Sequence, residues 1–190
     1  MDKQRTKLFN AIIYFSQNTR LCHKLKLMKL LYYLDFWHFK ETGKSVTGLN
    51  YKAWKLGPVP PTIYYEIEPE NNPNDMQEYL RTENEPLVKK DGRILHIIPK
   101  KKFNPKVFTI RELEILERVA KIFENEKAPE MSDSTHLSNS PWSRTIREKG
   151  DSAWIDYMLA LDDEDISLFP EELKERIELD NETKELISKL

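Results

Sequence analysis

The chain contains only one cysteine, Cys22, among its 190 residues. A single thiol cannot form an intrachain disulfide, and it excludes zinc sites that are built from several cysteines. A lone cysteine is typical of proteins from a reducing compartment, so we expect a cytoplasmic protein in which Cys22 is buried and inert. A chain of this length can bury a substantial core without a disulfide or a metal. The fold must therefore depend on packing.

Long apolar runs are also missing from the sequence. A membrane-spanning helix needs about 20 consecutive apolar residues, whereas the longest candidate, residues 30–39, contains Asp35 and His38. The first 17 residues begin basic and turn apolar, but they lack the small-residue cleavage site of a signal peptide. We therefore expect a soluble protein with no membrane partner.

Glycine is scarce, and the five glycines form no phosphate-binding loop. The sequence also lacks a Gly-x-Ser-x-Gly elbow and a His-Glu-x-x-His pair. His38 and His136 could form an acid/base pair or bind a metal with Asp35, but no ligand spacing supports either role, and packed or capping histidines are commoner. The sequence therefore predicts a protein that is not an enzyme and uses neither a metal nor a cofactor.

What the chain does contain is 39% hydrophobic and 33% charged residues, a balance that favours helices with one solvated face. Residues 3–17 carry apolar side chains at helical spacing. A capping box from Thr109 to Glu112 opens a second periodic helix that should end near Asn125. These patterns predict two amphipathic helices.

A third helix, residues 23–42, is apolar over most of its circumference, and Gly43 is placed to end it in a left-handed conformation. Such a helix belongs at the centre of a domain. Asp35 lies among its apolar positions, where an unpaired carboxylate is costly, so it should have a donor: a Trp indole, a Tyr hydroxyl or an N-terminal basic residue. The pattern leaves a narrow stripe for water, formed by Lys26, Lys29, Tyr33 and Lys40.

The strand signals are shorter. Residues 50–56 predict a strand, followed by a rigid turn at 57–61 and a helix that contains Ile63 and Ile67. The polar stretch up to Pro86 predicts a loop or a short helix. Asp91-Gly92 then predicts a hairpin between residues 87–90 and 93–98, which the 50–56 strand could join.

Residues 132–142 read as a Ser/Asn/Pro segment, and residues 154–161 as a short apolar helix. Together the elements predict a mostly helical α+β fold: a central apolar helix packed by surrounding helices, with a small antiparallel β-hairpin or a three-stranded sheet. We expect one domain over residues 1–161. Residues 162–190 would form an acidic helical extension, either packed on the domain or projecting from it.

The net charge is only −2, but basic residues crowd the N-terminal part and acidic residues crowd the tail after Leu161. Such runs are usually solvated faces, although the tail could also steer a basic partner. The isoelectric point is about 6.1, and neither a helix-turn-helix nor a zinc finger is evident. We do not expect specific nucleic-acid binding.

Several short elements follow one another in a distinctive order. They are Lys-Leu-Leu-Tyr-Tyr at residues 29–33, Trp37-His38, Ala53-Trp54, Gly57-Pro58-Val59, and His136 followed by Pro141-Trp142. Over about residues 5–160 the chain therefore resembles the Panacea domain family, which is related to SocA-type antitoxins. Aromatic and proline side chains pack in any compact fold, so we expect the motif residues to be mainly structural. These residues are Lys29, Leu30, Leu31, Tyr32, Trp37, Trp54, Gly57, Pro58, Val59, His136, Pro141 and Trp142.

The resemblance implies an antitoxin of a bacterial or phage toxin–antitoxin pair, which neutralises its cognate toxin by direct binding. Two alternatives share the scaffold: a proteolytic adaptor that delivers a toxin to a protease, and a phage or mobile-element protein that modulates a host process. The sequence identifies neither the toxin nor the oligomeric state, so homo-oligomers are left open.

Two surfaces are candidates for the partner contact. One is the stripe of Lys26, Lys29, Tyr33 and Lys40, because charge complementarity speeds encounter and selects partners. The other is the acidic tail, whose weak apolar stripe could fill a groove of the toxin. That stripe consists of Leu173, Ile177, Leu186 and Ile187.

Overall fold

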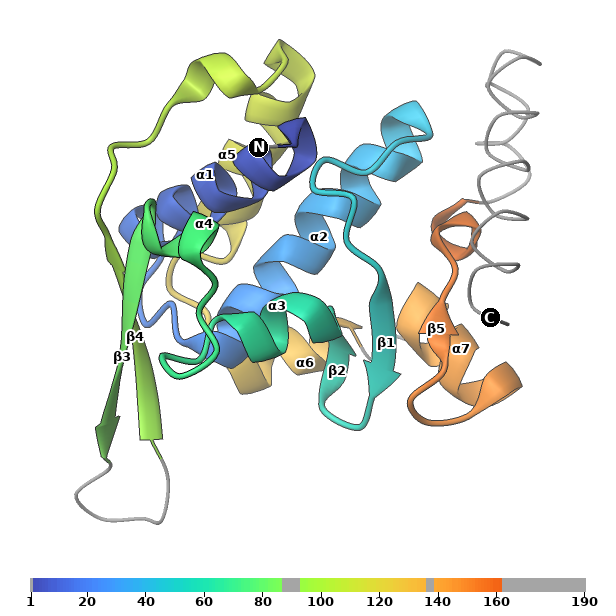
Figure 1. The fold of residues 1–190 in the computed structure, drawn as a ribbon. Helices are drawn as coiled ribbons and strands as arrows, with labels where there is room; N and C mark the ends of the chain where they lie inside the picture. Colours follow the sequence, from blue (N-terminus) through green and yellow to red (C-terminus); the bar gives the residue numbers. More distant parts are fainter. Residues whose placement is uncertain (1, 87–92, 136–138, 162–190) are drawn as a thin grey trace.

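Three helices form the centre of the structure: α1 (Lys3–Asn18), α2 (Lys24–Thr42) and α5 (Ile110–Ile122). Each of them packs against the other two (Figure 1). The computed structural model describes residues 2–86, 93–135 and 139–161. The predicted helices at 3–17 and 23–42 are therefore confirmed nearly to the residue.

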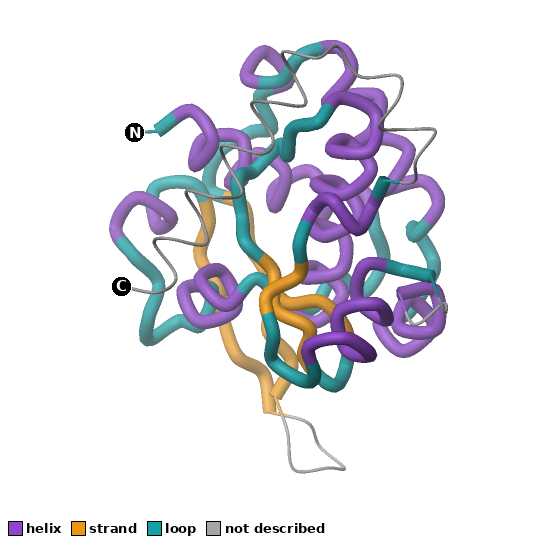
Figure 2. Tube along the Cα trace, turned by 90° about the vertical axis from the view of Figure 1, so that its right-hand side faces the viewer, coloured by secondary structure: helices purple, strands orange, loops and turns teal. Residues whose placement is uncertain are grey.

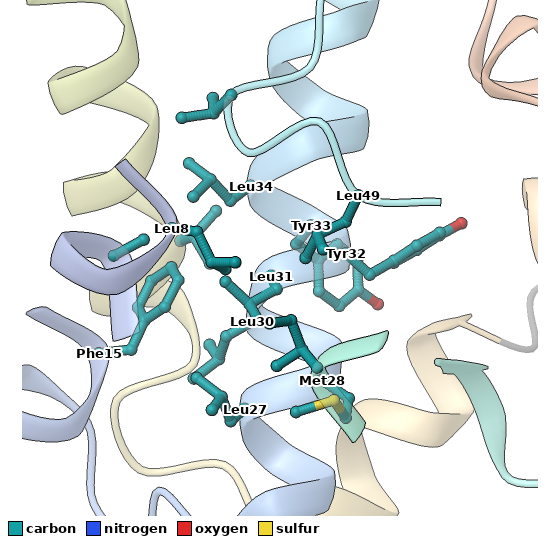
Figure 3. Packing of buried hydrophobic residues seen from close by; sticks show 14 of the residues in the cluster. Leu8, Phe15, Leu27, Met28, Leu30, Leu31, Tyr32, Tyr33, Leu34 and Leu49 are labelled. Carbon is teal, nitrogen blue, oxygen red and sulfur yellow. The ribbon is translucent and has the colours of Figure 1, made fainter. Parts of the chain in front are cut away.

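Helix α2 is the spine of the core, as its apolar pattern predicts. Its leucines at positions 27, 30, 31 and 34 are fully buried. Leu8 and Phe15 of α1 lie on one side of α2 and Tyr32 points to the other side (Figure 3), so the spine is covered all round. Gly43, with a φ of 68°, ends the helix in the predicted left-handed conformation.

The expectation that a stripe of α2 faces water is wrong for three of its four residues. Lys26, Lys29 and Tyr33 expose 1%, 3% and 8% of their surface, and only Lys40 is exposed. Helical periodicity could not reveal this, because loops far along the chain cover the stripe and supply backbone carbonyls to both lysines. A buried ammonium is tolerated when such acceptors surround it.

The predicted capping box of α5 is confirmed. Thr109 Oγ1 accepts a hydrogen bond from Glu112 N, and Glu112 Oε2 accepts one from Thr109 N. The other carboxylate oxygen of Glu112 forms an ion pair with Lys7 of α1. The start of α5 is thus tied to the first helix, and α5 ends at Ile122, three residues before the predicted end.

The predicted strand at 50–56 is β1 (Tyr51–Trp54), the central strand of a small antiparallel sheet ordered β2-β1-β5. The prediction of a simple turn at 57–61 is wrong for its first half, which forms β2 (Gly57–Val59). Gly57 has a φ of 119°, so the chain reverses tightly enough for Val59 to pair with Lys52. Proline is tolerated in β2 because β2 is an edge strand.

The short helix predicted at 154–161 is wrong at its start. Residues Trp154–Ile155 form β5, and only Tyr157–Ala160 turn, as the 3₁₀ helix η2. The backbone of Ala53 bonds both Ser152 and Ala153 at 2.8 Å, which draws this segment into the sheet. Long-range strand pairing has therefore outweighed the local apolar pattern.

A separate hairpin is formed by β3 (Leu80–Pro86) and β4 (Arg93–Pro99), paired from Leu80↔Pro99 to Pro86↔Arg93. Its second strand is as predicted, but the first lies before residues 87–90, which fall outside the described residues. The stretch expected as a loop or short helix contains α4 (Asn74–Gln77) and all of β3. Leu80 and Thr82 are buried on one face of β3, so buried and exposed residues alternate at its start. The sequence does not show this alternation because most residues of β3 are polar.

The strand β1 does not join this hairpin. The hairpin and the three-stranded sheet lie on opposite sides of α2, as the views of Figures 1 and 2 both show. Between them lies α3 (Pro61–Glu66), the helix predicted after the prolines.

Two helices occupy the region that we expected to be a polar segment. Helix α6 (Ala128–Thr135) and helix α7 (Pro141–Lys149) flank residues 136–138, which are outside the described residues. The missed signal for α7 is local: Ser140 caps the helix and Pro141 takes its first position. A 3₁₀ turn, η1 (Pro105–Val107), precedes α5.

The fold is the predicted one, a mostly helical α+β domain, and both of the alternative β elements are present. In the described ranges no helix is both long and apolar enough to cross a bilayer. The proposed extension at 162–190, with Leu173, Ile177, Leu186 and Ile187, lies outside the described residues.

Candidate partner-binding surface

Four residues of the sequence motif, Lys29, Trp54, Gly57 and Trp142, meet at the turn between β1 and β2. Lys29 Nζ donates a hydrogen bond of 2.7 Å to the carbonyl of Leu56, and Trp142 Nε1 donates one of 2.9 Å to the carbonyl of Trp54. Residues 57–60 directly after the turn are buried. Helices α2 and α7 thus hold the turn from two directions.

Burial lowers the pKa of Lys29 to about 8. The ammonium group lies against the core, where losing its hydration disfavours the charged form. Its bond to the Leu56 carbonyl offsets part of that cost, since hydrogen bonds from charged donors are stronger than neutral ones. The Leu56 carbonyl faces Lys29 inside the molecule, whereas the side chain of Leu56 faces solvent.

Asp35 has the donors that the sequence called for. Its Oδ1 accepts from the backbone N–H groups of Val46 and Thr47 at 2.9 and 2.8 Å. Its Oδ2 accepts from the hydroxyls of Tyr51, at 2.7 Å, and Thr47. A Tyr hydroxyl is one of the three donors expected. Burial raises the pKa of Asp35, while these four hydrogen bonds oppose the shift.

The histidine alternatives can be judged in part. His38 Nδ1 lies 2.6 Å from the Lys44 carbonyl and 3.1 Å from the Thr42 hydroxyl, and the residue is buried, so this ring is a packed, hydrogen-bonded histidine as expected. His136 lies outside the described residues. In the part of the chain that is described, no three His, Cys, Asp or Glu side chains gather as metal ligands would.

An aromatic surface lies outside the turn. Trp54 contacts Tyr64 and Tyr65 of α3, with ring centroids 4.9 and 6.4 Å apart. The register of the sheet places Trp154 opposite Lys52, two residues before Trp54 and on the same face of β1. We call this surface, made of Trp54, Leu56, Tyr64, Tyr65 and Trp154, the aromatic face.

Much of the aromatic face is exposed to solvent and has lysines beside its rings. Leu56, Tyr65 and Trp154 expose 62%, 57% and 47% of their surface. Two lysines lie over its rings: Lys24 Nζ is 3.5 Å from the Tyr64 centroid and Lys52 Nζ is 4.7 Å from the Trp154 centroid. Lys24 also pairs with Glu68, so Lys52 is the lysine that adds positive charge to the edge of this surface.

The chemistry of the aromatic face suits protein binding. Trp and Tyr are the residues most enriched among those that dominate interface energies, because they bring large, rigid apolar areas with one polar edge. The turn that carries Trp54 and Leu56 is held in place by Lys29 and Trp142, so a partner would meet a preformed surface.

Of the residues of this surface, only Trp54 was among the candidate residues predicted from the sequence. Tyr64, Tyr65 and Trp154 lie on segments brought beside β1 by the reversal at Gly57 and by long-range pairing. The one available signal was the alternation of β1, which puts Lys52 and Trp54 on one face. Of the lysines expected to contact a partner, Lys40 alone is exposed, and it lies in the last turn of α2.

Comparison with known families gives one match. A family model described as antitoxin SocA-like, Panacea domain, matches residues 27–143. The match begins in the first turn of α2 and extends to Ser143, just past Trp142, so it includes every motif residue proposed from the sequence. The same comparisons with curated proteins and with solved structures give no match.

Proposed function

The chain belongs to the family of SocA-like antitoxins with a Panacea domain, and from this premise we propose that it neutralises a cognate protein toxin by binding it directly. The observation that carries the proposal is the family match over α2, the β1–β2 turn and the start of α7. Binding alone completes the function, so no catalytic step is required.

The aromatic face is the proposed contact. It offers exposed Leu56, Tyr65 and Trp154 around the better-packed Trp54, the arrangement of anchors and rim found at interface hot spots. A stable interface buries about 800 Å² per partner, so the toxin would also cover the flanks of this face. Lys52 favours a toxin surface that carries carboxylates at its edge.

The first test is co-expression with the gene that neighbours this one, scored by growth and by co-purification of the two products. Restored growth with a stable complex supports direct neutralisation. Restored growth with falling toxin levels, dependent on a host protease, would instead identify a proteolytic adaptor. An absence of any toxicity would contradict the antitoxin proposal and favour the phage or mobile-element alternative.

The second test locates the contact. We expect Tyr65→Ala and Trp154→Ala each to weaken the complex at least ten-fold by calorimetry, because truncating a hot-spot aromatic removes its buried area. Ile110→Ala is the matched control. Ile110 is 78% exposed and begins α5, where the neighbouring Arg111 pairs with Glu41 in the last turn of α2. Equal losses for all three variants would exclude the aromatic face.

The acidic tail remains a second proposed contact, through Leu173, Ile177, Leu186 and Ile187. A chain that ends at Phe169 tests it separately from the aromatic face. Unchanged neutralisation by this shortened chain would remove the tail from the proposal and leave the aromatic face.

A further inference from the structure

A groove of about 650 Å³ lies beside the aromatic face, between the start of α2, the start of β4 and the start of α6. Its walls include Leu21, Leu25, Ile94 and Pro129. Lys24 and Glu68 also line it, and Lys24 is the residue whose ammonium covers the Tyr64 ring. Lys24 thus lies both in the groove and against the aromatic face.

Leu21 is held in a conformation that local physics disfavours. Its φ is 51°, in the left-handed region that a branched side chain rarely adopts, and 57% of its surface is exposed. Leucine thus bears backbone strain here while gaining little burial. Strained residues of this kind persist only where the surrounding structure fixes them, and they concentrate at functional sites.

The surrounding structure does fix this loop. Buried Lys26 donates hydrogen bonds to the carbonyls of Arg20, Glu126 and Glu124, at 2.7, 2.6 and 3.2 Å. Arg20 N donates to the Glu124 carbonyl at 2.8 Å. Lys26, which we expected on the surface, is therefore buried, and its hydrogen bonds connect the loop that carries Leu21 to the segment after α5.

Leu25 adds a second exposed leucine to the groove, with 39% of its surface exposed, and Ile94 is half-buried. Contiguous apolar surface that faces water marks interaction sites. Three exposed charged residues line the groove, the basic Arg93 and Lys127 and the acidic Glu70, while Lys24 pairs with Glu68, so basic side chains outnumber acidic ones at the rim. The groove thus combines an apolar floor with a basic rim.

We propose that this groove binds a segment of the toxin that carries large aliphatic or aromatic side chains flanked by carboxylates. The proposal rests on the proposed function and deepens it, because the same toxin that covers the aromatic face would extend into the groove. The apolar side chains contact Leu21 and Leu25, and the carboxylates face Arg93 and Lys127.

Leu21→Gly is the most informative variant. Glycine adopts a positive φ without strain, so the midpoint of thermal unfolding stays the same or rises. The affinity for the partner that co-purifies with the wild-type chain falls at least ten-fold by calorimetry. A purely structural role for Leu21 predicts the opposite pattern, a lower unfolding midpoint with unchanged affinity.

Leu25→Ser and the double change Arg93→Glu with Lys127→Glu test the floor and the rim. Each weakens binding about ten-fold, and the charge reversal also reduces the salt dependence of the affinity. Ile110→Ser, an exposed aliphatic outside the groove, is the control and leaves affinity unchanged.

The outcomes separate the two proposals. Wild-type affinity for the Leu21, Leu25 and charge-reversal variants, with Tyr65→Ala still impaired, overturns the groove and leaves the proposed function intact. A wild-type chain that captures no neighbouring gene product overturns both.

Discussion

Asp35 shows how one buried charge can organise a loop. Its two carboxylate oxygens accept four hydrogen bonds from residues 46, 47 and 51, so the chain after α2 is folded back onto the spine. The sequence predicted that a donor must exist because the position is apolar. Identifying all four required the structure, since the two backbone N–H groups and the Thr47 hydroxyl have no sequence signature.

We predict that Asp35→Leu destabilises the domain by about 3–5 kcal/mol, because removing one partner leaves several buried donors unsatisfied. Urea denaturation followed by circular dichroism measures the loss. Asp151→Asn, at an exposed aspartate, should change stability by less than about 0.5 kcal/mol. A loss for Asp35→Leu no larger than this control would show that the four hydrogen bonds contribute little.

Lys29 gives a pH prediction. Its pKa is lowered to about 8 in the folded state, from 10.5, so above pH 8 the unfolded chain binds more protons. Lys29 should therefore contribute a rise in stability of about 1–2 kcal/mol between pH 8 and 9.5 and no change below pH 7. Burial raises the pKa of Cys22 to about 11, which opposes this rise, so the comparison with a Lys29 variant isolates the lysine. Urea midpoints across this range measure the rise.

The rise should be smaller in Lys29→Met. Burial also lowers the pKa of Lys26, which adds a slope of the same sign, so the rise is reduced rather than abolished. An equal rise in the wild type and the variant would mean that Lys29 is better hydrated than its position suggests.

At the scale of single elements, the best sequence predictions were those governed by neighbours in the chain. The capping box of α5 and the left-handed Gly43 at the end of α2 involve residues within a few positions of one another. The poorest were β2 and β5, whose strand conformation depends on pairing with β1. A segment of two or three residues has no periodicity of its own to detect.

We predict that Thr109→Ala costs about 1 kcal/mol, because it removes one half of the capping box. The free energy of unfolding from chemical denaturation checks the value. Thr109→Ser retains the hydroxyl and should stay within about 0.5 kcal/mol of the wild type. Equal losses for both variants would point to the lost methyl group instead of the cap.

At the scale of the whole molecule, the described residues share one core. The buried cluster contains residues of all three central helices, of both sheets and of the connecting segments. Lys7 and Glu112 join α1 to α5 within it. The hairpin and the three-stranded sheet are separate in hydrogen bonding, but both pack on this core.

We therefore predict a single cooperative unfolding transition. Three of the four tryptophans, Trp54, Trp142 and Trp154, report on the three-stranded sheet and its surroundings, and the fourth, Trp37, lies on α2 and is replaced by Phe for this test. Far-ultraviolet circular dichroism reports mainly on the helices. The urea curves from tryptophan fluorescence and circular dichroism should coincide. Separate midpoints would show that the sheet and the helices unfold independently.

The sequence by itself determined the class of fold, the central helix, the caps and the family, because these follow from local spacing and from residues close together in the chain. It also determined the charge distribution: residues 162–190 hold 11 of the 32 acidic side chains and 4 of the 30 basic ones, which leaves the first 161 residues with a net charge of +5.

The tertiary structure alone decided which side chains are exposed. A helical wheel predicts that Lys26 and Lys29 face solvent, yet segments far along the chain cover them and accept their hydrogen bonds. Tyr65 packs against Trp54 and Trp154 pairs opposite Lys52, and both remain exposed. Exposure depends on what the rest of the chain covers, and that coverage is set by contacts between residues far apart in sequence.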